Sequence, residues 1–176
     1  FFRFSIRLAF ESMGKKDALV NLFVYGTLRR EERQRITPDR FDIPAFRRNA
    51  FLETGKILDD APFLGFATTS GKLFDVGRYP GMIEGEGQVY GEVYQVEPDG
   101  LSMIDLLEGF DPENHLESHY LRQEVELMVN GNEKLNGEAY YYNLEIDHLP
   151  LIPSGDYCQY LDCLLYTSDA ADDRLS

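Results

Sequence analysis

The sequence is poor in cysteine and contains no long hydrophobic run. Its two cysteines, Cys158 and Cys163, are too few for the disulfide framework of a small secreted domain, and a lone C-x4-C lacks the further ligands that a zinc site needs. No stretch approaches the roughly 18 consecutive apolar residues of a membrane-spanning helix. We therefore expect a protein of the reducing cytoplasm that is not inserted in a membrane.

Basic residues are also scarce. Lys and Arg number 17 against 31 Asp and Glu, which gives a formal net charge of -14. An acidic surface of this size repels phosphate backbones and anionic headgroups, so we expect neither nucleic acid nor a membrane as a partner. Hydrophobic residues make up 43% and aromatic residues 13% of the 176, which is enough for one folded domain.

The two ends of the chain differ from the rest. Residues 1–12 are basic and aromatic, but they lack an initiator Met, a long apolar centre and a cleavage site. Residues 167–176 show no apolar period, and residues 164–176 resemble translated adapter or vector sequence. We therefore predict a domain at residues 13–163, flanked by ends that are non-native or disordered.

The remaining chain carries more strand signals than helix signals. The segment 98–109, with an early Pro98 and a final Gly109, predicts the clearest helix, and the charge-dense segment 31–48 predicts a short helix or a loop. Gly91 in mid-strand indicates a bulge or the close approach of another group. Strands are expected at 21–25, at one or two places within 51–69, and at 72–76, 88–96, 120–129 and 134–144. Six or seven strands with a few helices indicate an α+β fold, a small antiparallel-rich β-barrel.

The first expected strand breaks abruptly at Tyr25-Gly26-Thr27-Leu28. Glycine lets the backbone approach another group closely, and the unpaired N–H groups of such a turn can hold an anion or a polarised carbonyl. The alternative is a core strand that simply ends in a tight turn. These residues alone leave both interpretations open.

Glu108 is the strongest candidate for acid–base chemistry. Leu101, Ile104 and Glu108 are spaced i, i+3, i+7, so the carboxyl group continues an apolar helical face. It also lies in the last turn, where the helix dipole disfavours negative charge. Burial and dipole both raise a carboxyl pKa, as a general acid/base near neutral pH requires. The alternative is a side chain that extends from the helix end into water.

Other chemistries have less support. His115 and His119, with neighbouring Glu113 and Glu117, could suggest a metal, but the segment is a polar loop and we expect solvated residues. No G-x-S-x-G elbow is present, and the Gly-rich loop at residues 84–87 is not followed by the helix and lysine of a nucleotide site. The strand tyrosines could bind polar groups, but most are expected to pack in the core or at its rim. We expect no metal and no organic cofactor.

Six short motifs occur in an order that is specific as a set. They are Phe23–Arg30 (FVYGTLRR), Tyr79–Gly81, Val89–Tyr94, Ile104–Gly109, Tyr120–Arg122 and Ala139–Tyr142. In this order they resemble the gamma-glutamylcyclotransferase-like family, which includes gamma-glutamylamine cyclotransferases and the plant avirulence-induced-gene-like proteins. The resemblance spans about residues 21–145.

The resemblance implies a six- or seven-stranded barrel and an enzyme that cyclises a γ-glutamyl amine or amino acid. The products are 5-oxoproline and the free amine, and no cofactor is needed. The resemblance thus implies a small-molecule partner, and we expect a monomer or weak homodimer. The family's catalytic glutamate corresponds to Glu108, which would act as base and then as acid. Its substrate loop corresponds to Tyr25, Gly26, Thr27 and Leu28, which would hold the substrate through the backbone.

Two tyrosines complete the expected substrate contacts. They are Tyr120 and a tyrosine of the last strand, for which Tyr142 is the preferred match among Tyr140, Tyr141 and Tyr142. The long acidic loop 110–119 departs from the family pattern and is a candidate for closing over the site. A second hypothesis is a non-catalytic binding or regulatory domain on the same barrel, in which Glu108 only recognises an ammonium group. A metal-dependent hydrolase that uses the two loop histidines ranks well below both.

Overall fold

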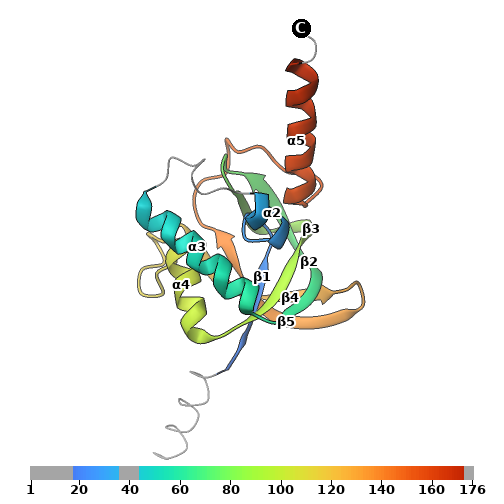
Figure 1. The fold of residues 1–176 in the computed structure, drawn as a ribbon. Helices are drawn as coiled ribbons and strands as arrows, with labels where there is room; N and C mark the ends of the chain where they lie inside the picture. The colour runs from blue at the N-terminus through green and yellow to red at the C-terminus, as the bar shows by residue number, and fades with distance from the viewer. Residues whose placement is uncertain (1–17, 36–43, 173–176) are drawn as a thin grey trace, which may run out of the picture.

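The computed structural model describes residues 18–35 and 44–172, with side chains described as far as residue 164 (Figure 1). In this part of the chain five strands and four helices are formed. In chain order they are β1 (Val20–Val24), α2 (Arg30–Arg35), α3 (Ala45–Asp60), β2 (Phe63–Asp75), β3 (Pro80–Val96), α4 (Pro98–Glu108), β4 (Tyr120–Val129), β5 (Glu133–Tyr142) and α5 (Tyr157–Asp172).

The strands close into a barrel in the order β1-β3-β2-β4-β5. Neighbouring strands are antiparallel except β1 and β5, which run parallel with Phe23 opposite Ala139. Helices α3 and α4 lie together on one side of the barrel (Figure 1). The predicted α+β class and the mixed, antiparallel-rich barrel are therefore confirmed.

The described residues form five strands, fewer than the expected six or seven. β2 and β3 are 13 and 17 residues long, and each covers a stretch that the sequence divides. The segment 72–76 belongs mainly to the end of β2, and 88–96 is the second half of β3. The register between β2 and β3 shifts between Ser70 and Lys72. The glycine between them therefore marks an irregularity at which β2 bends without ending.

Helix α3 corrects the expectation of a strand from residue 51 onward. Ala50, Thr54 and Leu58 are its buried residues, and they recur at the four-residue spacing of one helical face. Because one of the three is the polar Thr54, the apolar pattern of the sequence is only a weak signal for a helix here. The helix stops before Ala61 because a residue that precedes a proline is biased away from helical geometry. β2 then begins at Phe63.

Two hydrophobic clusters hold the fold together. One, which fills the barrel, includes Phe23, Val93 and Ala139, and the other, between the barrel and helices α3 and α4, includes Leu22 and Tyr94. Strands β1 and β3 contribute to both clusters, because successive side chains point to opposite faces. A Cβ atom on Gly91 would lie 2.4 Å from the carbonyl oxygen of Val24, so the predicted close approach at this glycine is confirmed.

Helix α5 runs from Tyr157 to Asp172, so the domain boundary predicted at residue 163 falls inside this helix. Tyr157 itself is buried in the barrel cluster. The predicted N-terminal flank, residues 1–12, lies outside the described residues. Among the helices of the described chain, none combines the length and apolar character needed to cross a membrane.

Candidate active site

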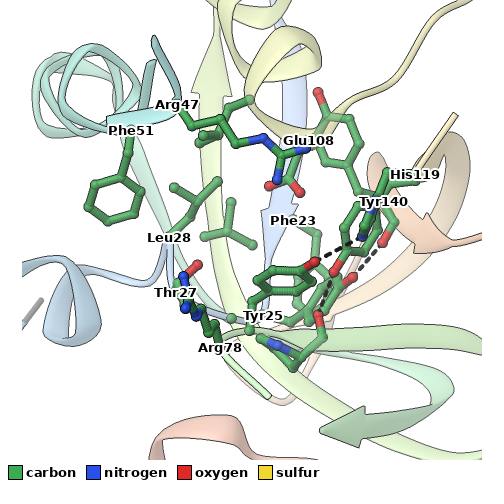
Figure 2. A pocket seen from close by; sticks show the side chains of 16 residues that line it. Phe23, Tyr25, Thr27, Leu28, Arg47, Phe51, Arg78, Glu108, His119 and Tyr140 are labelled. Atoms are coloured by element: carbon green, nitrogen blue, oxygen red, sulfur yellow. Dashed lines mark hydrogen bonds between the residues drawn. The ribbon is translucent and has the colours of Figure 1, made fainter. Parts of the chain in front are cut away.

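A cavity of about 160 Å³ opens where β1 meets helices α3 and α4 (Figure 2). This volume is well above the roughly 10–15 Å³ that holds one water, so a small molecule fits. Its lining residues come from segments far apart in the sequence. They are Phe23–Leu28, Arg47, Phe51, Arg78–Pro80, Leu107, Glu108, His119, Tyr120 and Tyr140.

The turn that follows β1 forms one wall of this cavity. The Arg29 N–H donates to the Gly26 carbonyl oxygen at 2.9 Å, which closes the turn. The N–H groups of Gly26, Thr27 and Leu28 form no hydrogen bond with another described residue. A Cβ atom on Gly26 would lie 2.6 Å from the Pro80 ring, so only glycine fits there without displacing its neighbour. The turn that lines the cavity thus has three backbone donors without a partner among the described residues.

The side chain of Tyr25 holds this turn in place. Its buried hydroxyl donates to the Tyr140 carbonyl oxygen at 2.6 Å and accepts from the Met82 N–H at 3.3 Å. Burial raises the pKa of Tyr25 well above its ordinary value, with the Glu108 charge adding to the rise, so the phenol is neutral. Because both hydrogen bonds go to the backbone, we assign the Tyr25 hydroxyl a structural role.

Glu108 forms the opposite wall, at the end of α4. Leu101 and Ile104 are buried on the same helical face, as the spacing predicts. The helix ends at Gly109, whose φ of 67° is in the left-handed region, and the Phe110 N–H then donates to the Asp105 carbonyl oxygen at 2.9 Å. This left-handed cap ends the helix directly after the glutamate.

The carboxyl group of Glu108 titrates near neutral pH. Burial raises the pKa of Glu108 to about 7, with Arg47 opposing the rise and Asp105 adding to it. At this pKa both the protonated and the ionised forms are populated near pH 7. A carboxyl group of this kind can accept a proton and return it within one reaction.

Arg47 enters the cavity from α3. Its guanidinium group points toward the Glu108 carboxyl group (Figure 2). These two described side chains do not form an ion pair. An anion and a cation therefore face the same small space without neutralising each other by direct contact. No sequence motif singled out Arg47, nor Phe51 and Arg78, which also line the cavity.

His119 is the clearest departure from the sequence-based expectation. It is half-buried, lines the cavity, and its Nε2 lies 3.0 Å from the Tyr79 hydroxyl. Burial lowers the pKa of His119, and Arg47 lowers it further, so the ring is neutral at pH 7. The expectation of a solvated loop residue is therefore wrong for His119, although His115 is exposed. In the described part of the chain, no cluster of three metal-ligating side chains is formed.

The tyrosines of β4 and β5 are placed by the strand pleat. Tyr120 lines the cavity and donates to the Pro80 carbonyl oxygen at 2.8 Å. Tyr141 points into the barrel cluster, whereas Tyr140 lies in the cavity wall. Tyr142, the preferred match from the sequence, pairs with Tyr120 at the end of β5, and its ring packs 5.4 Å from that of Tyr120. The structure therefore places Tyr140, rather than Tyr142, in the wall of the site.

The loop from Phe110 to His119 is tied down by Ser118. This serine is buried, and its hydroxyl accepts a hydrogen bond from the Asp111 N–H at 2.9 Å. The Asn143 side chain donates to the Ser118 carbonyl oxygen at 2.8 Å. These bonds place His119 against the end of α4, where its N–H donates to the Gly109 carbonyl oxygen at 2.9 Å.

Comparison with known proteins places this arrangement in a family. The profile of the family described as "Gamma-glutamyl cyclotransferase, AIG2-like" matches residues 22–159. A Vibrio cholerae protein, whose gamma-glutamylcyclotransferase name is itself provisional, is 32% identical over 141 residues, covering 78% of this chain and 95% of its own. The gamma-glutamylcyclotransferase family protein YtfP of Escherichia coli is 27% identical over 138 residues, covering 78% and 96%.

A solved structure has the same fold as this chain. The AIG2-like protein from Mus musculus superposes with a TM-score of 0.53 at 22% identity, covering 80% of this chain and 88% of that one. At this identity the likeness concerns the fold alone. Together with the profile match and the sequence relatives, it confirms the resemblance read from the motifs. The chain belongs to the AIG2-like gamma-glutamyl cyclotransferase family.

Proposed function

We propose that this protein cyclises a γ-glutamyl amine or γ-glutamyl amino acid to 5-oxoproline and releases the free amine. One observation carries the proposal. A carboxyl group with a pKa near 7, on Glu108, shares a small cavity with a turn whose N–H groups at Gly26, Thr27 and Leu28 lack partners among the described residues. The first group moves protons, and the second can bind a developing oxyanion.

In the proposed reaction the α-ammonium group of the substrate first loses one proton to solvent, and the neutral α-amine nitrogen then attacks its own γ-carbonyl carbon. The new C–N bond closes the five-membered ring, and the electron pair of the carbonyl bond moves to oxygen. The Glu108 carboxylate takes the proton that the attacking nitrogen loses. When the intermediate collapses, the C–N bond to the departing amine breaks, and Glu108 gives the proton to that nitrogen. No oxidant, reductant, metal or water enters the balance.

The turn at Gly26–Leu28 supports the second half of this chemistry. Backbone N–H groups that are already fixed in direction stabilise a tetrahedral oxyanion without reorganising during the reaction. Tyr25 and Pro80 fix the turn from either side, through two hydrogen bonds and a close ring contact respectively. The attack is intramolecular, so holding the substrate in a folded conformation is itself a large part of catalysis.

Arg47 and Glu108 together suggest how the substrate is oriented. The α-carbon of a γ-glutamyl group carries an ammonium and a carboxylate side by side. A carboxyl group and a guanidinium group that face one cavity without pairing match that head group. The amine would then lie at Glu108 and the carboxylate at Arg47. The apolar side chains of Leu28, Phe51 and Leu107 are left to contact the departing part.

The second candidate is a binding domain without turnover, because an anion and a cation in a cavity also suffice to recognise an amino-acid head group. A panel of γ-glutamyl amines, amino acids and peptides, assayed for 5-oxoproline, separates the two. Release of 5-oxoproline from at least one member supports the enzyme. Saturable binding by calorimetry, without 5-oxoproline from any member, would favour the binding domain. We further propose that the protein acts in the cytoplasm as a monomer or weak homodimer, in keeping with a sequence that contains only two cysteines.

A further inference from the structure

Asp105 lies on α4, one helical turn before Glu108, and is held by two different strands. Its Oδ1 accepts hydrogen bonds from Arg122 Nε of β4 at 2.8 Å and from the Tyr140 hydroxyl of β5 at 2.7 Å. Arg122 Nη2 approaches its second oxygen at 3.4 Å. The Asp105 carboxylate thus connects helix α4 to both β4 and β5.

Arg122 is held on its other sides as well. It forms an ion pair with Glu138 of β5, and its guanidinium group stacks 5.4 Å from the centre of the Phe110 ring, just after the helix cap. The Asp105 and Arg122 side chains are only 16% and 21% exposed. Hydrogen bonds between charged groups in such a half-buried position have more fixed geometry than surface ion pairs. The contacts therefore fix the position of the last turn of α4 relative to β4 and β5, and also its rotation about the helix axis.

We propose that Asp105 is a positioning residue for Glu108. By binding Arg122 and Tyr140 at once, it holds the final turn of α4 so that the Glu108 carboxyl group faces the turn at Gly26–Leu28. The inference rests on the proposed function, because it concerns the group that would transfer the proton. Asp105 does not line the cavity, so it acts through Glu108 and not on the substrate.

The negative charge of Asp105 predicts the direction in which the pKa of Glu108 changes when Asp105 is replaced. Four tyrosines surround Glu108, namely Tyr25, Tyr79, Tyr120 and Tyr140, and burial raises the pKa of each, so they are neutral near pH 7. His119 is neutral too, because burial lowers its pKa.

The full charges that remain near Glu108 are few. Arg47 and Arg78 line the cavity, and Asp105 lies on the helix itself. Of these three, only Asp105 is an anion, and an anion favours the protonated form of a neighbouring carboxyl group. Loss of its charge should therefore make Glu108 ionise at lower pH.

The test is a carbon NMR titration of the Glu108 carboxyl group in the full chain, with its signal assigned by its absence in Glu108→Gln. Asp105→Asn should lower the pKa of Glu108, because the neighbouring negative charge is gone. Arg122→Gln should raise it, because the Asp105 charge then loses its counter-charge. Asp99→Asn is the matched control, since Asp99 is an exposed acid in the first turn of the same helix and should leave the pKa unchanged.

Steady-state kinetics give the second readout. Both Asp105→Asn and Arg122→Gln should lower kcat on the order of 10- to 100-fold, because a misplaced catalytic group is inefficient. KM should change less than about threefold, since neither side chain touches the cavity. A Glu108 pKa that stays at the control value in both variants overturns the inference. If Asp105→Asn does not fold, Arg122→Gln alone tests the inference: a raised Glu108 pKa supports it, and an unchanged or lowered Glu108 pKa overturns it.

Failure of the proposed function would look different. Wild-type protein that releases no 5-oxoproline from the whole substrate panel contradicts the proposed function. The titrations require no turnover, so opposite shifts in Asp105→Asn and Arg122→Gln would still support the control of Glu108 by Asp105. Turnover in wild type with full kcat in both variants would contradict the positioning role and leave the proposed function intact.

Discussion

The Tyr25 hydroxyl donates a hydrogen bond to the Tyr140 carbonyl oxygen, 2.6 Å away. This bond joins the turn after β1 to β5, the strand that runs parallel to β1. Through its own hydroxyl, Tyr140 also reaches Asp105 on α4 at 2.7 Å. The two walls of the cavity, the turn and the end of α4, are therefore linked through a single residue of β5.

Tyr25→Phe tests this link. The substitution leaves the Tyr140 carbonyl oxygen and the Met82 N–H without this partner inside the fold. We expect the free energy of unfolding in urea to fall by about 1–3 kcal/mol, as is typical when buried polar groups lose their hydrogen bond. Tyr90→Phe is the control, because Tyr90 is 40% exposed and its hydroxyl donates to the exposed Gln88 side chain at 2.8 Å. Equal stabilities of the two variants would contradict the structural role of Tyr25.

Gly26→Ala tests the close approach in the substrate turn. A Cβ atom there would lie 2.6 Å from Pro80, so the turn must shift and carry its N–H groups with it. We expect kcat/KM to fall on the order of 100-fold, as for a misplaced catalytic group. Gly55→Ala is the matched control. Gly55 lies inside α3, and its Cβ atom would make an ordinary 3.8 Å contact with Arg33, so alanine should stabilise the helix by about 0.5–1 kcal/mol and preserve activity.

The features that could be predicted from the sequence are those encoded within a few neighbouring residues. The strand, glycine turn and hydroxyl at Phe23–Thr27 form a local signal, and the structure places them as expected. The i, i+3, i+7 stripe that ends at Glu108, with Gly109 as the stop, is a second local signal. In both places, propensity, apolar period and backbone chemistry favour the same structure.

The features that were missed depend on contacts between distant segments. Arg47 reaches the cavity only because α3 packs against α4, and its helix has a polar residue in its buried face. The sequence around His119 is typical of a polar loop. The pairing of β4 with β5, however, places the His119 ring in contact with the Tyr142 ring. The register that puts Tyr140 in the wall is likewise set by strand pairing, which three consecutive tyrosines cannot encode.

The pKa of Glu108 predicts the pH dependence of the reaction. The ionised form is the base, so kcat/KM should fall as pH decreases through about 7, the pKa at which burial holds this carboxyl group. An ordinary carboxyl group, with a pKa of 4.5, would keep the enzyme active well below neutral pH. A pH–rate profile of 5-oxoproline release measures this midpoint. A profile that stays flat down to about pH 5 would contradict Glu108 as the base.

Arg47→Gln tests the proposed orientation of the substrate. Loss of the guanidinium group should raise KM on the order of 10-fold or more, because the substrate carboxylate loses a charged partner. It should also raise the pKa of Glu108, because Arg47 favours the ionised carboxylate, and the midpoint of the pH–rate profile should move upward with it. Lys56→Gln removes an exposed positive charge from the same helix and serves as the control. Unchanged KM in Arg47→Gln would exclude this residue from substrate binding.

The central claim is that Glu108 transfers the proton, and 5-oxoproline release by wild type and by Glu108→Gln tests it most directly. Glutamine resembles the protonated side chain in shape but cannot accept a proton. Because burial raises the pKa of Glu108, ionisation opposes folding as pH rises from 4.5 through about 7. The variant should therefore be at least as stable as wild type at neutral pH, with unchanged circular dichroism. We predict that release falls at least about 1,000-fold in this folded variant. Turnover within about tenfold of wild type would contradict the assignment of Glu108.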